Sequence, residues 1–64
     1  MNNNTYVCTL PIETRSKIET ALWNHITNEL GLTGTDRQIA IQNAMNLRIC
    51  DLEDTIDIYG LLGL

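Results

Sequence analysis

Apolar residues recur at helical spacing in two stretches of this chain, and a glycine-containing linker separates the stretches. In the first stretch they lie within about 140° of arc, which is typical of a helix with one buried face. In the second they lie within roughly 80° of one another. The first set is Ile12, Ile18, Leu22, Trp23, Ile26 and Leu30, and the second is Ile41, Met45, Ile49, Leu52, Ile56 and Tyr59. The pattern predicts an all-α fold, either a helical hairpin or a small three-helix domain with a short extended N-terminal segment.

Two local signals mark the ends of the first helix. Pro11 suits a first helical turn, because the amide that proline lacks would be unpaired there. Gly31 can take the left-handed conformation that ends many helices, and Leu32 can then make an apolar contact with the last turn. These signals predict a first helix from about residue 11 to residue 30.

The second apolar stretch has a clear signal for the start of a helix, but the sequence leaves open whether it forms one helix or two. Thr35 and Gln38 have the spacing of a capping box, in which each side chain bonds the backbone amide of the other residue. Asp51, with another acid three residues later, resembles a second helix start. We therefore expect two helical segments, about 35–48 and 51–59, and one continuous helix is the alternative.

The two ends of the chain are short non-helical segments. Residues 6–10 are β-prone but too few to form a sheet alone, so we expect them to pack in extended form across the helices. The asparagine-rich residues 1–5 are expected to be flexible. Gly60 is expected to end the last helix, which leaves an apolar tail, 61–64, that either folds back over the core or contacts a partner. A chain of 64 residues is one small domain.

The formal net charge of -4 lies entirely at the C-terminal end of the chain. The preceding residues carry equal numbers of acidic and basic side chains, whereas residues 51–64 carry four acids and no Lys or Arg. On a helix over this segment, Glu53, Asp54 and Asp57 lie within about 100° of one another and face away from the apolar stripe. This acidic stripe has two interpretations. It is either a docking surface for a basic patch on another protein, or only the solvated face of a surface helix.

The favoured hypothesis is a non-enzymatic protein that binds and inhibits a larger protein partner through this acidic stripe. Eight acids are few for full mimicry of a nucleic acid, so we expect a limited patch supported by apolar contacts. The main alternative is a homo-oligomeric structural or regulatory module, with a homodimer built from the apolar tail and the face that carries Arg15 and Glu19. The candidate partner-binding residues are Asp51, Glu53, Asp54, Asp57, Leu61, Leu62 and Leu64.

A helix-turn-helix DNA-binding regulator is the least favoured alternative. Two helices joined by residues 31–34 have a suitable form. However, scattered basic residues and a net charge of -4 make a poor footprint for phosphates, so direct binding of nucleic acid is not expected. The basic residues are Arg15, Lys17, Arg37 and Arg48.

No catalytic site is predicted. His25 has no evident nucleophile or carboxylate partner in the sequence, and a domain this small has little room for a concave pocket of roughly 300 Å³ or more. Trp23 is predicted to be a core residue, because it offers the largest single burial in the chain. Arg15 and Glu19 are predicted to screen each other at the edge of the first apolar stripe.

The N-terminus and the lack of a long apolar run favour a cytoplasmic protein, and no cofactor is expected. No apolar run approaches the roughly 20 residues of a membrane span, and the first residues do not resemble a signal peptide. Cys8 and Cys50 are therefore expected to stay reduced and to behave as small buried hydrophobes. Zinc and calcium sites are not expected, because neither the cysteine spacing nor the acid spacing suits them.

Five short motifs of the chain together resemble a known group of proteins. The motifs are LPIE at 10–13, KI at 17–18, LGL at 30–32, AMNLR at 44–48 and CDLEDTIDI at 50–58. They span most of residues 10–58, and the combination resembles short, uncharacterised helical proteins carried by phages and other mobile elements of Gram-positive bacteria. The resemblance implies no site residues, since that group has no settled function. It implies genomic company: small acidic proteins of such elements often block host defence nucleases or effectors, as anti-CRISPR proteins do, and we expect a partner of that kind.

Overall fold

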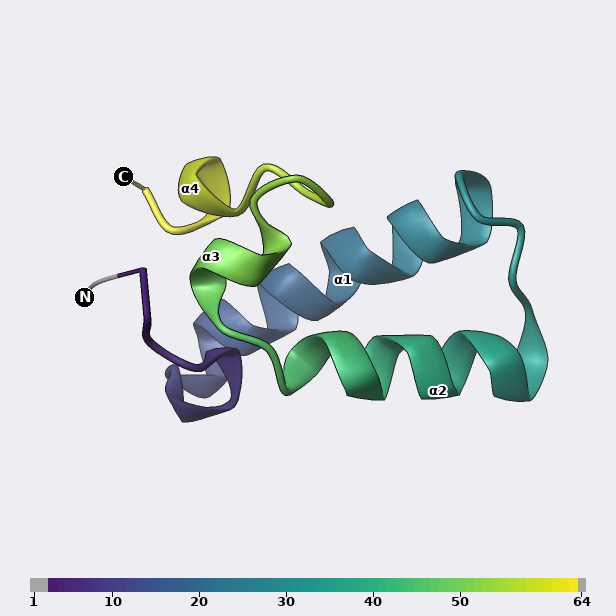
Figure 1. Ribbon diagram of the computed structural model, residues 1–64, viewed down its shortest axis with the longest axis horizontal. Coiled ribbons are helices and arrows are strands. Elements are labelled where there is room, and N and C mark those ends of the chain that lie inside the picture. The colour runs from purple at the N-terminus through teal and green to yellow at the C-terminus, as the bar shows by residue number, and fades with distance from the viewer. Residues whose placement is uncertain (1–2, 64) are drawn as a thin grey trace.

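The computed structural model of the protein describes residues 3–63, which form helical elements and no β-strand. This result confirms the all-α prediction. The two longest helices, α1 and α2, form a hairpin, and the short helices α3 and α4 lie at the end where α1 begins and α2 ends (Figure 1). The elements are the 3₁₀ turn η1 (Val7–Thr9), α1 (Ile12–Asn28), α2 (Gly34–Met45), α3 (Ile49–Leu52) and α4 (Ile58–Leu61).

The hydrophobic core receives side chains from all five elements. Val7 is the contribution of η1, and Leu10, which follows η1, is buried as well. Every core side chain is apolar, and the described residues include no buried polar or charged residue. The buried residues are Val7, Leu10, Ile18, Leu22, Ile26, Ile41, Ile49, Leu52 and Ile58.

Helix α1 is slightly shorter than the predicted 11–30, because Pro11 is its N-cap and Glu29 is its C-cap. The predicted Gly31 turn does follow the helix, but the buried face of the helix is narrower than predicted. Gly31 has a φ of 69°, and the Leu32 amide donates to the Ile26 carbonyl at 3.2 Å, so the glycine turns the chain back onto the helix. Ile12 and Leu30, which belong to the predicted stripe, are exposed. The helix therefore packs mainly through residues four apart in sequence, which lie close to one line on its surface.

The prediction that Trp23 belongs to the core is wrong. Its side chain is 44% exposed, while the neighbouring Leu22 is fully buried. Consecutive residues of a helix point about 100° apart, so Trp23 points to the side of the narrow line that Ile18, Leu22 and Ile26 form on the buried face. The largest side chain of the protein is therefore available at the surface.

The predicted capping box at the start of α2 is also wrong. Helix α2 begins at Gly34, with Thr33 as its N-cap and no side-chain capping bond. Thr35 and Gln38 both lie inside the helix. Gly34 has a φ of 59°, a conformation that glycine adopts without the steric cost of a Cβ atom, and this lets the helix begin before Thr35.

The second apolar stretch is neither one helix nor the two segments 35–48 and 51–59. It is divided among α2, α3 and α4, and Gly60 lies inside α4 rather than after it. The six residues of the predicted second stripe nevertheless all belong to the core or pack against it. Ile58, which the stripe omits, is fully buried as well, because α4 starts a new helical face.

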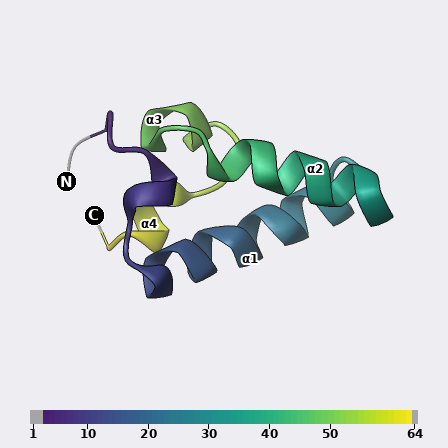
Figure 2. The ribbon, with the colours of Figure 1, turned by 90° about the horizontal axis from the view of Figure 1, so that it is seen from below.

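The N-terminal segment packs across the end of the hairpin, between α3 and the start of α1 (Figure 2). The predicted extended form is wrong for residues 7–9, which form the 3₁₀ turn η1. Tyr6 forms an isolated antiparallel bridge with Arg48, and the Val7 amide donates to the Leu47 carbonyl at 3.0 Å. The Cys50 amide donates to the Asn3 carbonyl, also at 3.0 Å. Of the segment 1–5 that is expected to be flexible, residues 1 and 2 lie outside the described part of the chain. Between residues 3 and 63, no helix has the length and apolar character needed to cross a membrane.

Candidate functional site

The acidic residues of the C-terminal end gather where the chain turns from α3 to α4. Asp51 lies in α3, Glu53 and Asp54 follow in the turn, and Asp57 is the N-cap of α4. All four side chains are exposed. The acids therefore do not form a stripe on one helix, as the sequence suggests, but project from a tight turn. We call Glu53, Asp54 and Asp57 the acidic loop.

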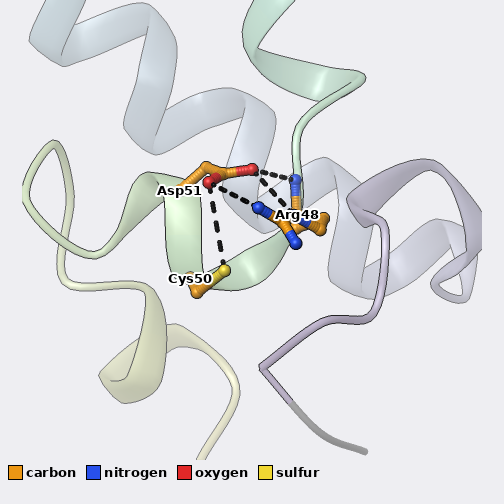
Figure 3. A network of polar contacts seen from close by, with 3 residues as sticks. All are labelled: Arg48, Cys50 and Asp51. Atoms are coloured by element: carbon orange, nitrogen blue, oxygen red, sulfur yellow. Dashed lines mark hydrogen bonds and ion pairs between the residues drawn. The ribbon is translucent and has the colours of Figure 1, made fainter.

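Asp51 is separated from the acidic loop by its own ion pair with Arg48. The Asp51 Oδ2 atom accepts hydrogen bonds from the Arg48 backbone amide at 3.1 Å and from the Arg48 Nε atom at 3.2 Å (Figure 3). Arg48 Nη2 and the Cys50 thiol approach the Oδ1 atom at 3.4 and 3.9 Å. These bonds cap α3, since the amide and the carboxylate belong to its N-cap and its first turn.

The same contacts change the proton affinities of both groups. The side-chain hydrogen bond from Arg48, followed by the backbone one, lowers the pKa of Asp51 below its ordinary value. The hydrogen bond to Asp51 in turn raises the pKa of Arg48. The negative charge of Asp51 is thus fixed and locally neutralised, which leaves it less free for an external partner than the other acids.

Two carboxylates of the acidic loop are held by hydrogen bonds that leave their charge uncompensated. Glu53 Oε2 accepts from the Tyr59 hydroxyl at 2.9 Å, and this bond raises the pKa of Tyr59. Asp57 Oδ1 accepts from the Gly60 amide at 3.3 Å as the cap of α4. A Cβ atom at position 60 would overlap the Asp57 carboxylate, so the capping geometry requires glycine there.

No basic residue neutralises the acidic loop in the described part of the chain. The pair between Arg48 and Asp51 is the salt bridge found among residues 3–63, and residues 51–63 contain no Lys or Arg. Three exposed carboxylates therefore share one turn without an internal counter-charge. Such a group attracts a cationic surface over a distance of roughly 8 to 10 Å at physiological salt.

The apolar tail folds back over the core, one of the two outcomes expected from the sequence. Leu61 lies in α4, and both Leu61 and Leu62 are half-buried and pack against the core. The Leu62 amide donates to the Ile58 carbonyl at 3.0 Å, which ties the tail to α4. Leu64, the last of the predicted apolar contacts, lies outside the described residues.

A pocket between α1 and α2 contradicts the expectation that this chain is too small to hold one. Its volume is about 410 Å³, within the range of small-molecule sites. Three amide side chains of the α2 region recur every fourth residue beside the core residue Ile41, and this spacing is the signal that could have indicated a polar wall. The lining residues are Cys8, Arg15, Glu19, Trp23, Gln38, Ile41, Gln42, Met45 and Asn46.

Arg15 lines this pocket, and Arg37 contacts Trp23, another of its lining residues. The Arg37 guanidinium lies 3.6 Å from the centroid of the Trp23 ring and donates from Nη1 to Thr27 Oγ1 at 3.2 Å, so it joins α2 to α1. Arg15 lines the pocket, and its Nε atom is buried without a hydrogen-bond partner. The predicted screening pair between Arg15 and Glu19 does not form an ion pair, although both side chains line the same pocket.

The remaining chemically interesting side chains are dispersed. Cys8 and Cys50 are both free thiols, and the prediction that both are buried is wrong. Cys8 is exposed at the surface of η1, and Cys50 is half-buried in α3. His25 is half-buried in α1. Across residues 3–63, no three side chains of the His, Cys, Asp and Glu types are grouped as metal ligands.

The fold and the site together define a small all-α domain with an uncompensated acidic loop and an open pocket along its helical hairpin. Comparison of the chain with protein-family models, curated proteins and solved structures finds no match. The resemblance to phage and mobile-element proteins stays a prediction from the sequence.

Proposed function

We propose that this chain is a small non-enzymatic protein of the cytoplasm that docks through its acidic loop onto a basic patch of a larger protein and thereby inhibits that protein. The observation that carries the proposal is the group of three exposed carboxylates without an internal counter-charge. Complementary charge speeds the encounter of two proteins and fixes their relative orientation.

The geometry of the loop supports docking rather than simple solvation. The Glu53 and Asp57 carboxylates are each oriented by a hydrogen bond, to Tyr59 and Gly60 respectively. Oriented carboxylates lose less conformational freedom when they bind a guanidinium or ammonium group. Asp54 lies between them in sequence without such a bond and adds charge that can adapt to the partner.

The kind of partner follows from the charge and from the sequence resemblance. A protein surface that holds nucleic-acid phosphates presents clustered Arg and Lys side chains, which carboxylates can also pair with. A host defence nuclease, such as a CRISPR effector, has such a surface. The acidic loop would then cover residues that otherwise hold a nucleic acid.

The apolar tail has a smaller part in this proposal than the sequence suggests. Leu61 and Leu62 already pack against the core of the chain itself, so only their exposed portions can add contact area around the loop. The acidic loop is accordingly the first target for mutation.

The test is a comparison of two triple variants that have the same net charge. One removes the loop charges by Glu53→Gln, Asp54→Asn and Asp57→Asn, whose side chains keep oxygen atoms that accept the structural hydrogen bonds. The control removes three acids elsewhere, by Glu13→Gln, Glu29→Gln and Asp36→Asn. Circular dichroism verifies that both variants are as helical as the wild type.

Each protein is then used to capture partners from a Gram-positive lysate, and the retained proteins are identified by mass spectrometry. We expect a basic protein that the wild type and the control retain and that the loop variant loses. Equal retention by both triple variants would contradict docking through the loop, and retention only of further copies of the chain would favour a homo-oligomeric module.

A further inference from the structure

The pocket between α1 and α2 combines an apolar floor with opposite charges at its wall. Ile41 is 7% exposed and belongs to the core, and Met45 packs against the core beside it. Arg15 and Glu19, one turn apart on α1, supply one positive and one negative charge. The pocket is therefore suited to a molecule that carries both charges and an apolar group.

The two charged side chains are not satisfied by each other or by other described residues. No carboxylate among residues 3–63 forms an ion pair with Arg15, and no basic group forms one with Glu19. Burial of the Arg15 Nε atom without a partner removes part of the guanidinium from water. Because part of the guanidinium is removed from water, its charge is less screened, and a ligand carboxylate in the pocket can pair with it.

The aromatic wall of the pocket is held in place before any ligand arrives. Arg37 stacks on the Trp23 ring and is itself bonded to Thr27. A ring that is already fixed loses little conformational freedom on binding. Trp23 thus offers an ordered aromatic surface next to Glu19, with which it also lines a second, smaller hollow on α1.

The α2 side supplies amide groups to complete the recognition of a polar ligand. Gln38, Gln42 and Asn46 all line the pocket. The Asn46 Nδ2 atom donates to the backbone carbonyl of Gln42 at 3.0 Å, which leaves the Asn46 side-chain oxygen as an acceptor. Acceptors and donors are therefore present on the wall that faces the charged pair across the hairpin.

We propose that this pocket binds a free α-amino acid with an apolar side chain. The α-carboxylate pairs with the Arg15 guanidinium, the α-ammonium pairs with the Glu19 carboxylate, and the side chain lies on Ile41 and Met45 beside the Trp23 ring. The pocket is formally neutral, so a zwitterion fits its charge better than a simple anion or cation does. A peptide does not supply this group, because its free ammonium and carboxylate are on different residues.

The test uses the full chain and three probes that share the leucine side chain and differ at the α-amino or the α-carboxyl group. L-Leucine carries both charges, N-acetyl-L-leucine lacks the ammonium, and L-leucinamide lacks the carboxylate. Binding is followed by Trp23 fluorescence, since Trp23 is the single tryptophan of the chain, and by ¹H–¹⁵N chemical shifts. We expect saturable shifts in the pocket residues with leucine at concentrations up to about 10 mM, and binding weaker by about tenfold or more for both analogues.

Two variants assign the two charges. Arg15→Gln should abolish the preference for leucine over leucinamide, and Glu19→Gln should abolish the preference over N-acetyl-leucine. Glu13→Gln, which removes an acid of α1 outside the pocket, should leave both preferences unchanged. The absence of saturable binding, or equal affinity for leucine and either analogue in the wild type, would overturn the proposal. The test shares no residue with the acidic loop, so its outcome is independent of the proposed docking function.

Discussion

Individual polar side chains decide where the second half of the chain bends. Asp51, together with Arg48, caps α3, and Asp57 caps α4. Each cap supplies acceptors for backbone amides that have no partner within their helix. The apolar stripe that predicts a long helix is therefore interrupted twice, while its residues still reach the core.

The Asp51 cap should make stability depend on pH in the acidic range. The folded-state pKa of Asp51 lies below its ordinary value of 3.8, so its contribution is fully present above that pH. The contribution is lost as the pH falls through the lower, folded-state pKa. We expect the difference in unfolding free energy between the wild type and Asp51→Asn to shrink below about pH 3.8, as measured by urea unfolding. A difference that stays constant down to about pH 2 would contradict this account.

Gly60 and Asp57 should be energetically coupled. Asp57→Ala removes the cap of α4 and should cost about 0.5–2 kcal/mol in the wild type. A Cβ atom in Gly60→Ala would displace the same carboxylate, so Asp57→Ala should cost close to nothing in that background. Urea unfolding of the four proteins of this double-mutant cycle gives the coupling. Equal costs in both backgrounds would show that the carboxylate does not cap the helix.

At the scale of whole helices, the sequence predicts the glycine turn that follows α1, but it does not predict which side chains of α2 pack against α1. The left-handed Gly31 is a local feature, because only the conformation of one residue is needed to end α1. The exposure of Trp23 depends instead on what α2 places opposite it, namely Arg37, which the sequence does not reveal. The pocket depends in the same way on two helices at once, so the sequence did not indicate it.

The break between α3 and α4 also exceeded what the sequence alone could predict. The sequence predicts that a helix starts at Asp51, but α3 starts at Ile49, and Asp51 lies in its first turn. Asp57 resembles the other acids of the segment, because its bond to the Gly60 amide is visible only in the structure. The all-α class and the core membership of the second apolar stripe survive this error. In the first stripe, only Ile18, Leu22 and Ile26 are core residues. The hydrophobic spacing is carried by many residues, so one error does not remove the pattern. A helix start depends on one or two residues, so its position is easily missed.

Alanine variants of two neighbouring residues of α1 test whether Trp23 is a surface residue rather than a core residue. Leu22→Ala should cost about 2–5 kcal/mol of unfolding free energy, because Leu22 is fully buried. Trp23→Ala should cost less, mainly the stacking with Arg37, which is about 0.5–2 kcal/mol. Urea unfolding of both variants provides the comparison. A larger loss for Trp23→Ala would place Trp23 in the core after all.

At the scale of the whole molecule, the acidic loop and the pocket lie on different parts of one small fold. The acidic loop connects α3 and α4, whereas the pocket lies between α1 and α2 with Cys8 of η1 at its edge. A domain of 64 residues buries only about 60% of the surface of its unfolded chain, so its stability is marginal. Binding of a partner or a ligand to either region should raise the unfolding temperature.

The most direct test of the proposed function is the affinity of the purified partner for three forms of the chain, measured by titration calorimetry at two salt concentrations. The proposal predicts that the variant with Glu53→Gln, Asp54→Asn and Asp57→Asn binds about tenfold or more weakly than the wild type. The control with Glu13→Gln, Glu29→Gln and Asp36→Asn should match the wild type, and the advantage of the wild type should decrease at higher salt. Equal affinities of the two triple variants would contradict docking through the acidic loop.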